Sequence, residues 1–196
     1  MNIFDDLSYQ YKKGGVSNKI IFWNIGAFLL SFFFYQFKLG VFNFPNGLPL
    51  DSSYQALIYQ PWTLITYAFL HTGFLHLFFN LMIFNYSSQL FLTFFSQKQL
   101  LGLYILSAIF AGLCFVGSYS LMDSSSKIVG ASGAVMAILV ATTTYRPLME
   151  VRLMFLGTIK LWYLTAIIVL VDAMQILVEN TGGHIVHIAG SIFGFI

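Results

Sequence analysis

Long apolar runs separated by short polar segments restrict most strongly what this chain can fold into. Such runs occupy residues 20–37, 74–95, 100–121, 132–145 and 161–178, and another begins at Ile185. Only 8% of the residues are charged, too few to cover the surface of a soluble domain, which usually carries about 25%. We therefore expect an all-α fold, a polytopic membrane helical bundle with six transmembrane helices.

Two of these runs are short for a bilayer core of about 30 Å, which needs about 20 helical residues. The run at 132–145 predicts a short central helix that the others shield, with a water-filled pit at one end. The run from Ile185 reaches only Ile196, and about a dozen helical residues rise only about 18 Å. We expect this sixth span to be truncated.

The remaining segments suggest a single domain over residues 1–196. Residues 1–18 are polar and resemble a cytoplasmic lead-in, which could form a surface helix, and not a cleaved signal peptide. Residues 38–66 hold three of the four prolines and many aromatic residues. They predict a loop in the membrane interface, with a disordered linker as the alternative.

The basic residues predict the orientation of the chain, because cytoplasmic segments are enriched in Lys and Arg. If the N-terminus is cytoplasmic, the outer segments contain only Lys38 and Lys127. The inner segments then hold Lys12, Lys13, Lys19, Lys98, Arg146, Arg152 and Lys160. This orientation places the 38–66 loop and the first residues of the 132–145 helix on the outer side.

Composition also excludes several classes of partner and cofactor. No basic block is long enough to indicate nucleic-acid binding. The single cysteine, Cys114, excludes an internal disulfide and a cysteine-rich metal site. The sequence shows no cofactor site, and it does not predict an oligomeric state.

A serine between two glycines opens the 132–145 run, in the sequence Gly-Ala-Ser-Gly-Ala-Val-Met-Ala from Gly130. Ser132 is a candidate nucleophile, because a hydroxyl at this place could be approached closely by other backbones. It needs a base, and the only histidines are His71, His76, His184 and His187. A soluble-hydrolase elbow, G-x-S-x-G, is excluded because Ala134 holds its last position and no strand is expected before it.

Two polar residues in the second run fall on one helical face. His76 and Asn80 are four positions apart, and polar groups in a membrane helix often mark function. As two donors they could stabilise an oxyanion. Alternatively, they form an interhelical hydrogen bond of about 0.6 kcal/mol that only holds the bundle together.

The last run places His187, Gly190 and Gly194 on one face, and its G-x-x-x-G spacing allows close helix packing. The 132–145 run offers a matching strip of small residues, Gly133, Ala137 and Ala141. If these strips face each other, His187 lies beside Ser132.

Metal binding is the other chemistry that these histidines suggest. His184 and His187, together with His71 and His76, could form a four-histidine site. The nearest carboxylates are Asp172 and Glu179. The sequence leaves this reading open as the alternative to nucleophilic catalysis.

At these residues the chain resembles the rhomboid family of intramembrane serine proteases, and the resemblance covers nearly its whole length. The segment from Gly130 fits the family's G-x-S-G-x-x-x-A. His71, His76 and Asn80 fit its second-helix pattern, and His187, Gly190 and Gly194 fit its last-helix pattern. The chain departs from many relatives at Thr63, where they have an arginine after the loop tryptophan.

The resemblance implies a role for each of these residues. Ser132 would be the nucleophile and His187 its general base, in a dyad without a carboxylate, while His184 remains the alternative base. The oxyanion hole would consist of His76, Asn80 and the Ser132 backbone N–H. The remaining motif residues would be supporting ones: His71, Gly130 and Gly133.

The resemblance also implies the partners: the lipid bilayer and transmembrane protein substrates with a single span, cleaved near the outer membrane face. Two alternatives remain. One is a catalytically inactive relative that binds membrane clients. The other is a small transporter, which would need charged residues along its path, whereas only Asp172 and Lys160 lie near a span. We expect Asp172 to cap or hydrogen-bond near the outer end of the fifth helix.

Overall fold

The structure is a computed structural model that describes residues 2–36, 39–122, 124–153, 157–176 and 180–196. Several residues named above lie outside these ranges: Phe37, Lys38, Val178 and Glu179.

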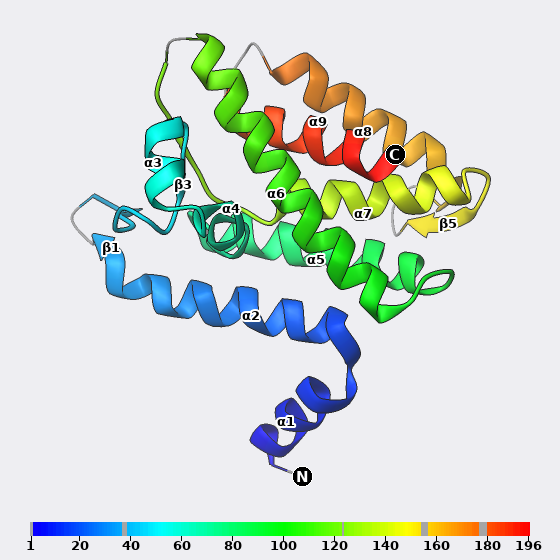
Figure 1. Ribbon diagram of the computed structural model, residues 1–196. Helices are drawn as coiled ribbons and strands as arrows, with labels where there is room; N and C mark the ends of the chain where they lie inside the picture. Colours follow the sequence, from blue (N-terminus) through cyan, green and yellow to red (C-terminus); the bar gives the residue numbers. More distant parts are fainter. Residues whose placement is uncertain (1, 37–38, 123, 154–156, 177–179) are drawn as a thin grey trace.

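A bundle of helices forms the body of the molecule (Figure 1). Its members are α2 (Gly15–Ser31), α5 (Phe74–Leu92), α6 (Gln97–Met122), α7 (Ser132–Tyr145), α8 (Leu161–Gln175) and α9 (Thr181–Phe195). The polar lead-in forms α1 (Ile3–Lys13), which projects from the start of α2 and has no buried residue. The bounds of α7 are those expected from the sequence, and α5, α6, α8 and α9 lie within a few residues of the expected runs.

The first apolar run differs from the others, because the observed helix is shifted from the predicted one. Its helix begins at Gly15 and ends at Ser31, about five residues earlier than expected at each end. The aromatic residues that follow form a 3₁₀ turn, η1 (Phe32–Phe34), and then β1 (Tyr35–Gln36), which pairs with β2 (Val41–Phe42). Gly40 turns the chain between the strands with φ of 66°. Apolarity alone does not distinguish this aromatic hairpin from the end of a helix.

The segment at 38–66 is more regular than the loop predicted for it. It contains β3 (Leu50–Asp51), α3 (Tyr54–Tyr59) and α4 (Thr63–Thr66), followed by the 3₁₀ turn η2 (Tyr67–Phe69). Hydrogen bonds hold it together: the Trp62 indole N–H donates to the Gly47 carbonyl at 2.8 Å, and the Thr66 hydroxyl donates to the Leu48 carbonyl at 2.7 Å. These are folded elements, which argues against the disordered linker.

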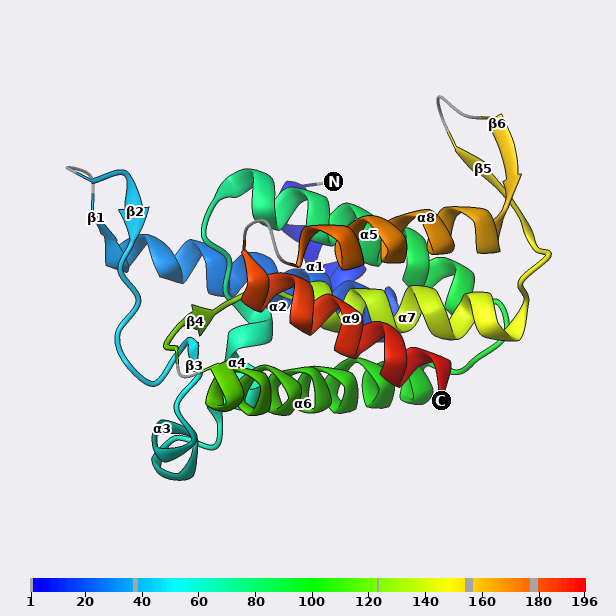
Figure 2. The same ribbon diagram turned by 90° about the horizontal axis from the view of Figure 1, so that it is seen from above.

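The segment between the fourth and fifth apolar runs also contains regular structure. There β5 (Glu150–Leu153) pairs antiparallel with β6 (Gly157–Lys160). The fold is therefore mainly helical with short two-stranded sheets and not purely α. Figure 2 shows this hairpin at the opposite end of the bundle from β1, β2, β3 and α3.

Helix α7 lies at the centre of the bundle, where α5, α6, α8 and α9 all pack against it (Figure 2). Every residue from Gly133 to Val140 is buried. A helix that is apolar all round must be covered on every side, which explains why this short run is central. The short shielded helix expected from the sequence is confirmed.

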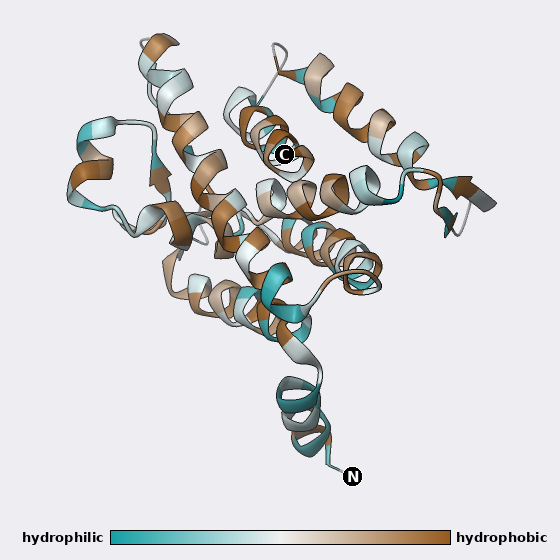
Figure 3. Ribbon diagram, turned by 45° about the vertical axis from the view of Figure 1, so that its right-hand side comes forward, coloured by the Kyte–Doolittle hydropathy of each residue, from teal (hydrophilic) through white to brown (hydrophobic). Residues whose placement is uncertain are grey.

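The outer helices are apolar on the sides that face away from the bundle. Brown, hydrophobic residues follow them in Figure 3, whereas α1 is largely teal. Within the described residues, two helical stretches are long and apolar enough to cross a membrane, Gly15–Phe34 and Gln97–Met122. A third is reached if the bent pair Thr63–Phe69 and Phe74–Leu92 counts as one span. Helices α7 and α8 are apolar but shorter.

Candidate active site

The turn that precedes α7 is tied to the 38–66 segment. β4 (Lys127–Ile128) pairs antiparallel with β3, and Ser52 and Ser126 exchange two hydrogen bonds of 2.9 Å. The Gly130 N–H donates to the Tyr67 carbonyl at 2.9 Å, with φ of 134° at Gly130, a conformation open mainly to glycine. These contacts fix the point at which Ser132 begins the helix.

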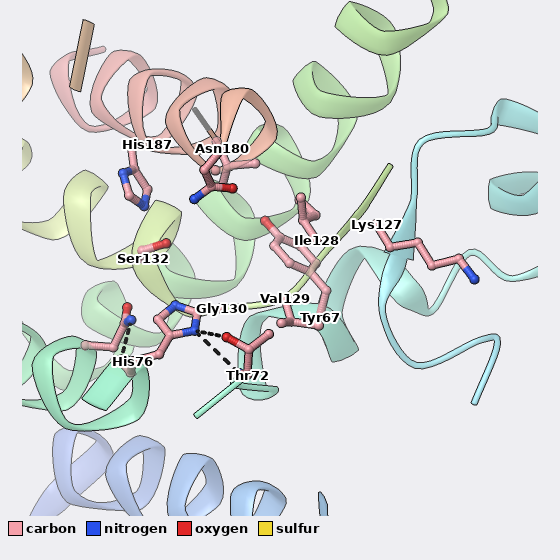
Figure 4. A pocket seen from close by; sticks show the side chains of 13 residues that line it. Tyr67, Thr72, His76, Lys127, Ile128, Val129, Gly130, Ser132, Asn180 and His187 are labelled. Atoms are coloured by element: carbon pink, nitrogen blue, oxygen red, sulfur yellow. Dashed lines mark hydrogen bonds between the residues drawn. The ribbon is translucent and has the colours of Figure 1, made fainter. Parts of the chain in front are cut away.

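Ser132 lies in a pocket of about 330 Å³ to which three helices contribute candidate residues. Ser132 comes from α7, His76 and Asn80 come from α5, and His187 comes from α9. Figure 4 shows Ser132 between His187 and His76. Among the hydrogen bonds of the described residues, none joins the Ser132 hydroxyl to His187. The fold thus gathers residues that are up to 111 positions apart (76 to 187) at one place.

The expected small-residue strips do face each other, and they bring α9 to this place. A Cβ added to Gly190 would overlap the Gly133 carbonyl, and one added to Gly194 would overlap the Ala137 carbonyl. The two backbones are therefore in direct contact along the G-x-x-x-G face. His187 lies one turn before this contact and so reaches the pocket beside Ser132.

Thr72 sets the orientation of the His76 ring. The Thr72 hydroxyl lies 3.1 Å from His76 Nδ1, and the Thr72 backbone N–H donates to the same nitrogen at 3.5 Å (Figure 4). An N–H can only donate, so Nδ1 accepts and a neutral ring carries its proton on Nε2. A Cβ placed on Gly130 would lie 3.1 Å from Nε2 and 3.6 Å from Ser132 Oγ, so this edge of the ring faces the serine.

Asn80 and His71 are placed differently from His76. Asn80 lines the pocket, and its amide nitrogen donates to the His76 carbonyl at 2.9 Å, which leaves a second N–H on that nitrogen. His71 is fully buried, and its ring packs edge-on against His76 with 5.0 Å between centroids. Its position is that of a support for His76 and not of a group that meets a substrate.

Comparison with known proteins supports the resemblance that these residues suggest. The family model described as Rhomboid domain matches residues 59–196, which is more than half of the chain. The chain belongs to the rhomboid family. No match was found among curated proteins. The family is generally one of intramembrane serine proteases that act on transmembrane substrates, and it includes inactive members. Together with the apolar helices, membership makes this chain an integral membrane protein.

This rhomboid differs from the expected dyad in one respect, because a carboxylate contacts the candidate base. Asp172 on α8 lies with Oδ1 2.9 Å from His187 Nδ1 and 2.6 Å from His184 Nδ1. The sequence predicted a pair without a carboxylate and did not predict this contact. Asp172 does form hydrogen bonds near the C-terminal end of α8, the fifth expected span. His184 does not line the pocket, which favours His187 as the histidine that serves Ser132.

The four histidines do not form one metal site. Among the described residues, the group with ligand atoms close enough for an ion is Asp172, His184 and His187, within 4.8 Å of one another. His71 and His76 lie outside this group. Direct hydrogen bonds from both imidazoles to one carboxylate oxygen account for the cluster without an ion.

Sequence reasoning missed several residues that line the pocket in this rhomboid. Among them are Thr72, Lys127 and Asn180. Asn180 precedes α9 with φ of 47°, a left-handed conformation that asparagine adopts more readily than most residues. Thr72 lies before α5 begins at Phe74, so the helical spacing of four residues does not predict its contact with His76.

Proposed function

We propose that this rhomboid is an intramembrane serine endopeptidase that uses Ser132 as nucleophile and His187 as general base. The observation that carries the proposal is the pocket in which Ser132, at the start of α7, meets His187 and His76 from two other helices. A serine, a histidine and an N–H donor at one place are the groups that acyl transfer requires.

In this mechanism the Ser132 hydroxyl attacks a substrate peptide carbonyl while Nε2 of His187 takes the hydroxyl proton. The tetrahedral oxyanion is stabilised by the Nε2–H of His76 and by the Ser132 backbone N–H, with Asn80 as a further donor. The first N–H groups of a helix have no partner within it, so the start of α7 offers such a donor. His187 returns the proton to the leaving amine, and water then hydrolyses the acyl-enzyme.

The proposed substrate is a transmembrane protein with a single span, cleaved near the outer membrane face. Its segment must unwind locally, because an intact helix keeps its carbonyls in hydrogen bonds. We further propose that residues 1–196 form a single domain with six spans, the N-terminus cytoplasmic and the pocket towards the outer side. The count of basic residues supports this orientation.

An inactive rhomboid that binds membrane clients is the second candidate. The missing hydrogen bond between Ser132 and His187 favours it, although catalytic hydrogen bonds are often long before substrate binds. Binding of a transmembrane client without turnover would support this candidate.

Cleavage of a model single-span substrate in liposomes tests the proposal. We expect the parent chain to cleave it, and Ser132→Ala and His187→Ala to lose at least about 10³-fold in kcat, since residues of a catalytic unit act together. Thermal unfolding in detergent should show that both variants remain folded. Cleavage by Ser132→Ala at the parent rate would exclude a serine mechanism.

A further inference from the structure

We propose that Asp172 is a positioning residue for His187: its carboxylate holds the imidazole in the orientation and tautomer that a general base for Ser132 requires. The inference rests on the proposed function, because it assigns a supporting group to the same site. It adds a third residue, from α8, to the serine on α7 and the histidine on α9.

The geometry of the contact carries this inference. Asp172 is buried, with 8% of its surface exposed, on a helix whose other residues are mostly exposed. Its Oδ1 lies 2.9 Å from His187 Nδ1, a distance typical of a charge-assisted hydrogen bond. The helix therefore turns its carboxylate inward, onto the ring that faces Ser132.

The direction of the proton follows from the chemistry of the two groups. An ionised carboxylate can only accept hydrogen bonds, so His187 must carry a proton on Nδ1. A neutral ring then has a free lone pair on Nε2, the nitrogen that can take the proton of the Ser132 hydroxyl. The same carboxylate would favour the imidazolium that forms during attack.

His184 shares the carboxylate but not the pocket. Its Nδ1 lies 2.6 Å from the same oxygen, and its side chain is buried away from Ser132. Two hydrogen bonds to one carboxylate offset the cost of placing it in an apolar bundle. The contact with His184 thus stabilises the carboxylate in place, whereas His187 is the ring in the pocket on which the carboxylate acts.

A purely structural role, as a tie between α8 and the bundle, is the competing explanation. A control for that role is available, because a second buried hydrogen bond also joins α8 to the bundle. The hydroxyls of Thr165 on α8 and Thr143 on α7 lie 2.7 Å apart. Thr165→Val removes a buried hydrogen bond between α8 and the bundle and leaves both histidines unchanged. It therefore controls for any effect of Asp172→Asn that comes only from weaker attachment of α8.

The test compares Asp172→Asn, Asp172→Glu and Thr165→Val with the parent chain in the liposome assay. The asparagine amide can donate to Nδ1 and so favour the wrong tautomer. We expect kcat to fall at least about tenfold, towards the roughly 10⁴-fold of the same change in a soluble serine protease, with KM little changed. Asp172→Glu should recover part of the loss, and Thr165→Val should keep the parent kcat.

A second readout does not depend on catalysis. In protein labelled with ¹⁵N-histidine, the signal of His187, assigned by its loss in His187→Ala, reports which nitrogen carries the proton. We expect Nδ1–H in the parent, and a shift towards Nε2–H in Asp172→Asn but not in Thr165→Val.

Two results would overturn the inference while leaving the protease itself intact. One is a parent-like kcat and an unchanged His187 signal in Asp172→Asn. The other is an equal loss of kcat in Asp172→Asn and Thr165→Val, which would mean that the carboxylate only holds α8 in place. A parent chain that cleaves nothing would instead contradict the proposed function, and the ¹⁵N signal would still decide whether Asp172 positions His187.

Discussion

His76 is a ring whose direction in the pocket is set by a specific neighbour. Because Thr72 contacts Nδ1, the donor on Nε2 faces the region of Ser132 without first having to reorient. A donor that is already oriented stabilises the negative charge that develops during the reaction. Little free energy is then needed to reorient the donor when that charge forms.

Replacing His76 by alanine should therefore lower kcat and leave KM nearly unchanged. We expect a loss of about 10²–10³-fold, the usual effect of removing one oxyanion donor. Thr72→Val, which removes only the hydroxyl, should have a smaller effect in the same direction. A His76→Ala variant with parent kcat in the liposome assay would remove His76 from the oxyanion hole.

Thr63 shows how this rhomboid differs from relatives with an arginine at that place. Its side chain is buried, and its hydroxyl donates to the Gln60 carbonyl at 2.7 Å within the turn that starts α4. The site therefore fits a small side chain with a hydroxyl, and an arginine placed there would lose this hydrogen bond and displace the atoms packed around it.

Thr63→Arg should accordingly destabilise the protein, by on the order of 2–4 kcal/mol in the free energy of unfolding. Thr63→Ser keeps the hydroxyl and should remain within about 1 kcal/mol of the parent. Denaturation in detergent micelles measures both values. An arginine variant as stable as the parent would mean that the 38–66 segment rearranges to accept the charge.

Among the helices, the contact between α7 and α9 places the site. The strips of Gly133 and Ala137 on one helix and of Gly190 and Gly194 on the other allow the backbones to touch. Any widening of this contact would move His187 away from Ser132.

Gly190→Ala should lower the free energy of unfolding by about 1–3 kcal/mol, because its Cβ would overlap the Gly133 carbonyl. Gly102→Ala is the matched control: it lies in α6 with no atom within 4 Å of the added Cβ, and alanine favours helix. Only the first change should reduce cleavage. Equal stability of the two variants would contradict the close packing.

The sequence predicted these helices unequally well, for physical reasons. The run at 132–145 is bounded by a glycine-containing turn and by Arg146 and Pro147, so both ends of α7 could be predicted. The first run continues into the 3₁₀ turn Phe32–Phe34 and then into β1, which pairs with β2 further along the chain. Hydropathy carries no information about that pairing. The predicted helix was therefore placed too far towards the C-terminus.

For the molecule as a whole, the bundle has two distinct ends (Figure 2). One end contains the 38–66 segment and the starts of α7 and α9. The start of α2 lies beside the start of α6, where the Val16 N–H donates to the Gln97 side chain at 2.7 Å. The basic residues Lys12, Lys13 and Lys98 therefore gather near one place, as a common cytoplasmic side requires.

Cysteine labelling on intact cells tests this orientation. In a Cys114→Ala background, an impermeant maleimide should label Ser125→Cys, which is exposed just before β4. It should not label Thr158→Cys, which is exposed on β6, until the cells are opened. Labelling of Thr158→Cys alone in intact cells would reverse the orientation and place the pocket on the cytoplasmic side.

At this scale the sequence predicted three polar residues that the pocket gathers but not the contact of the candidate base with Asp172. Ser132, His76 and His187 stand out because each is a polar residue in or beside an apolar run. Asp172 lies on another helix, 15 positions before His187, and its contact depends on how α8 turns against α9. Tertiary packing determines that rotation, and no local pattern in the sequence reports it.

Labelling of the purified protein by a fluorophosphonate probe, which reacts with activated serines, examines Ser132 as the nucleophile without the need for a substrate. We expect the parent chain to be labelled at Ser132, and labelling to be lost in Ser132→Ala and strongly slowed in His187→Ala. Folded parent protein that takes up no probe, or labelling that persists in Ser132→Ala, would contradict the assignment of Ser132 as an activated nucleophile.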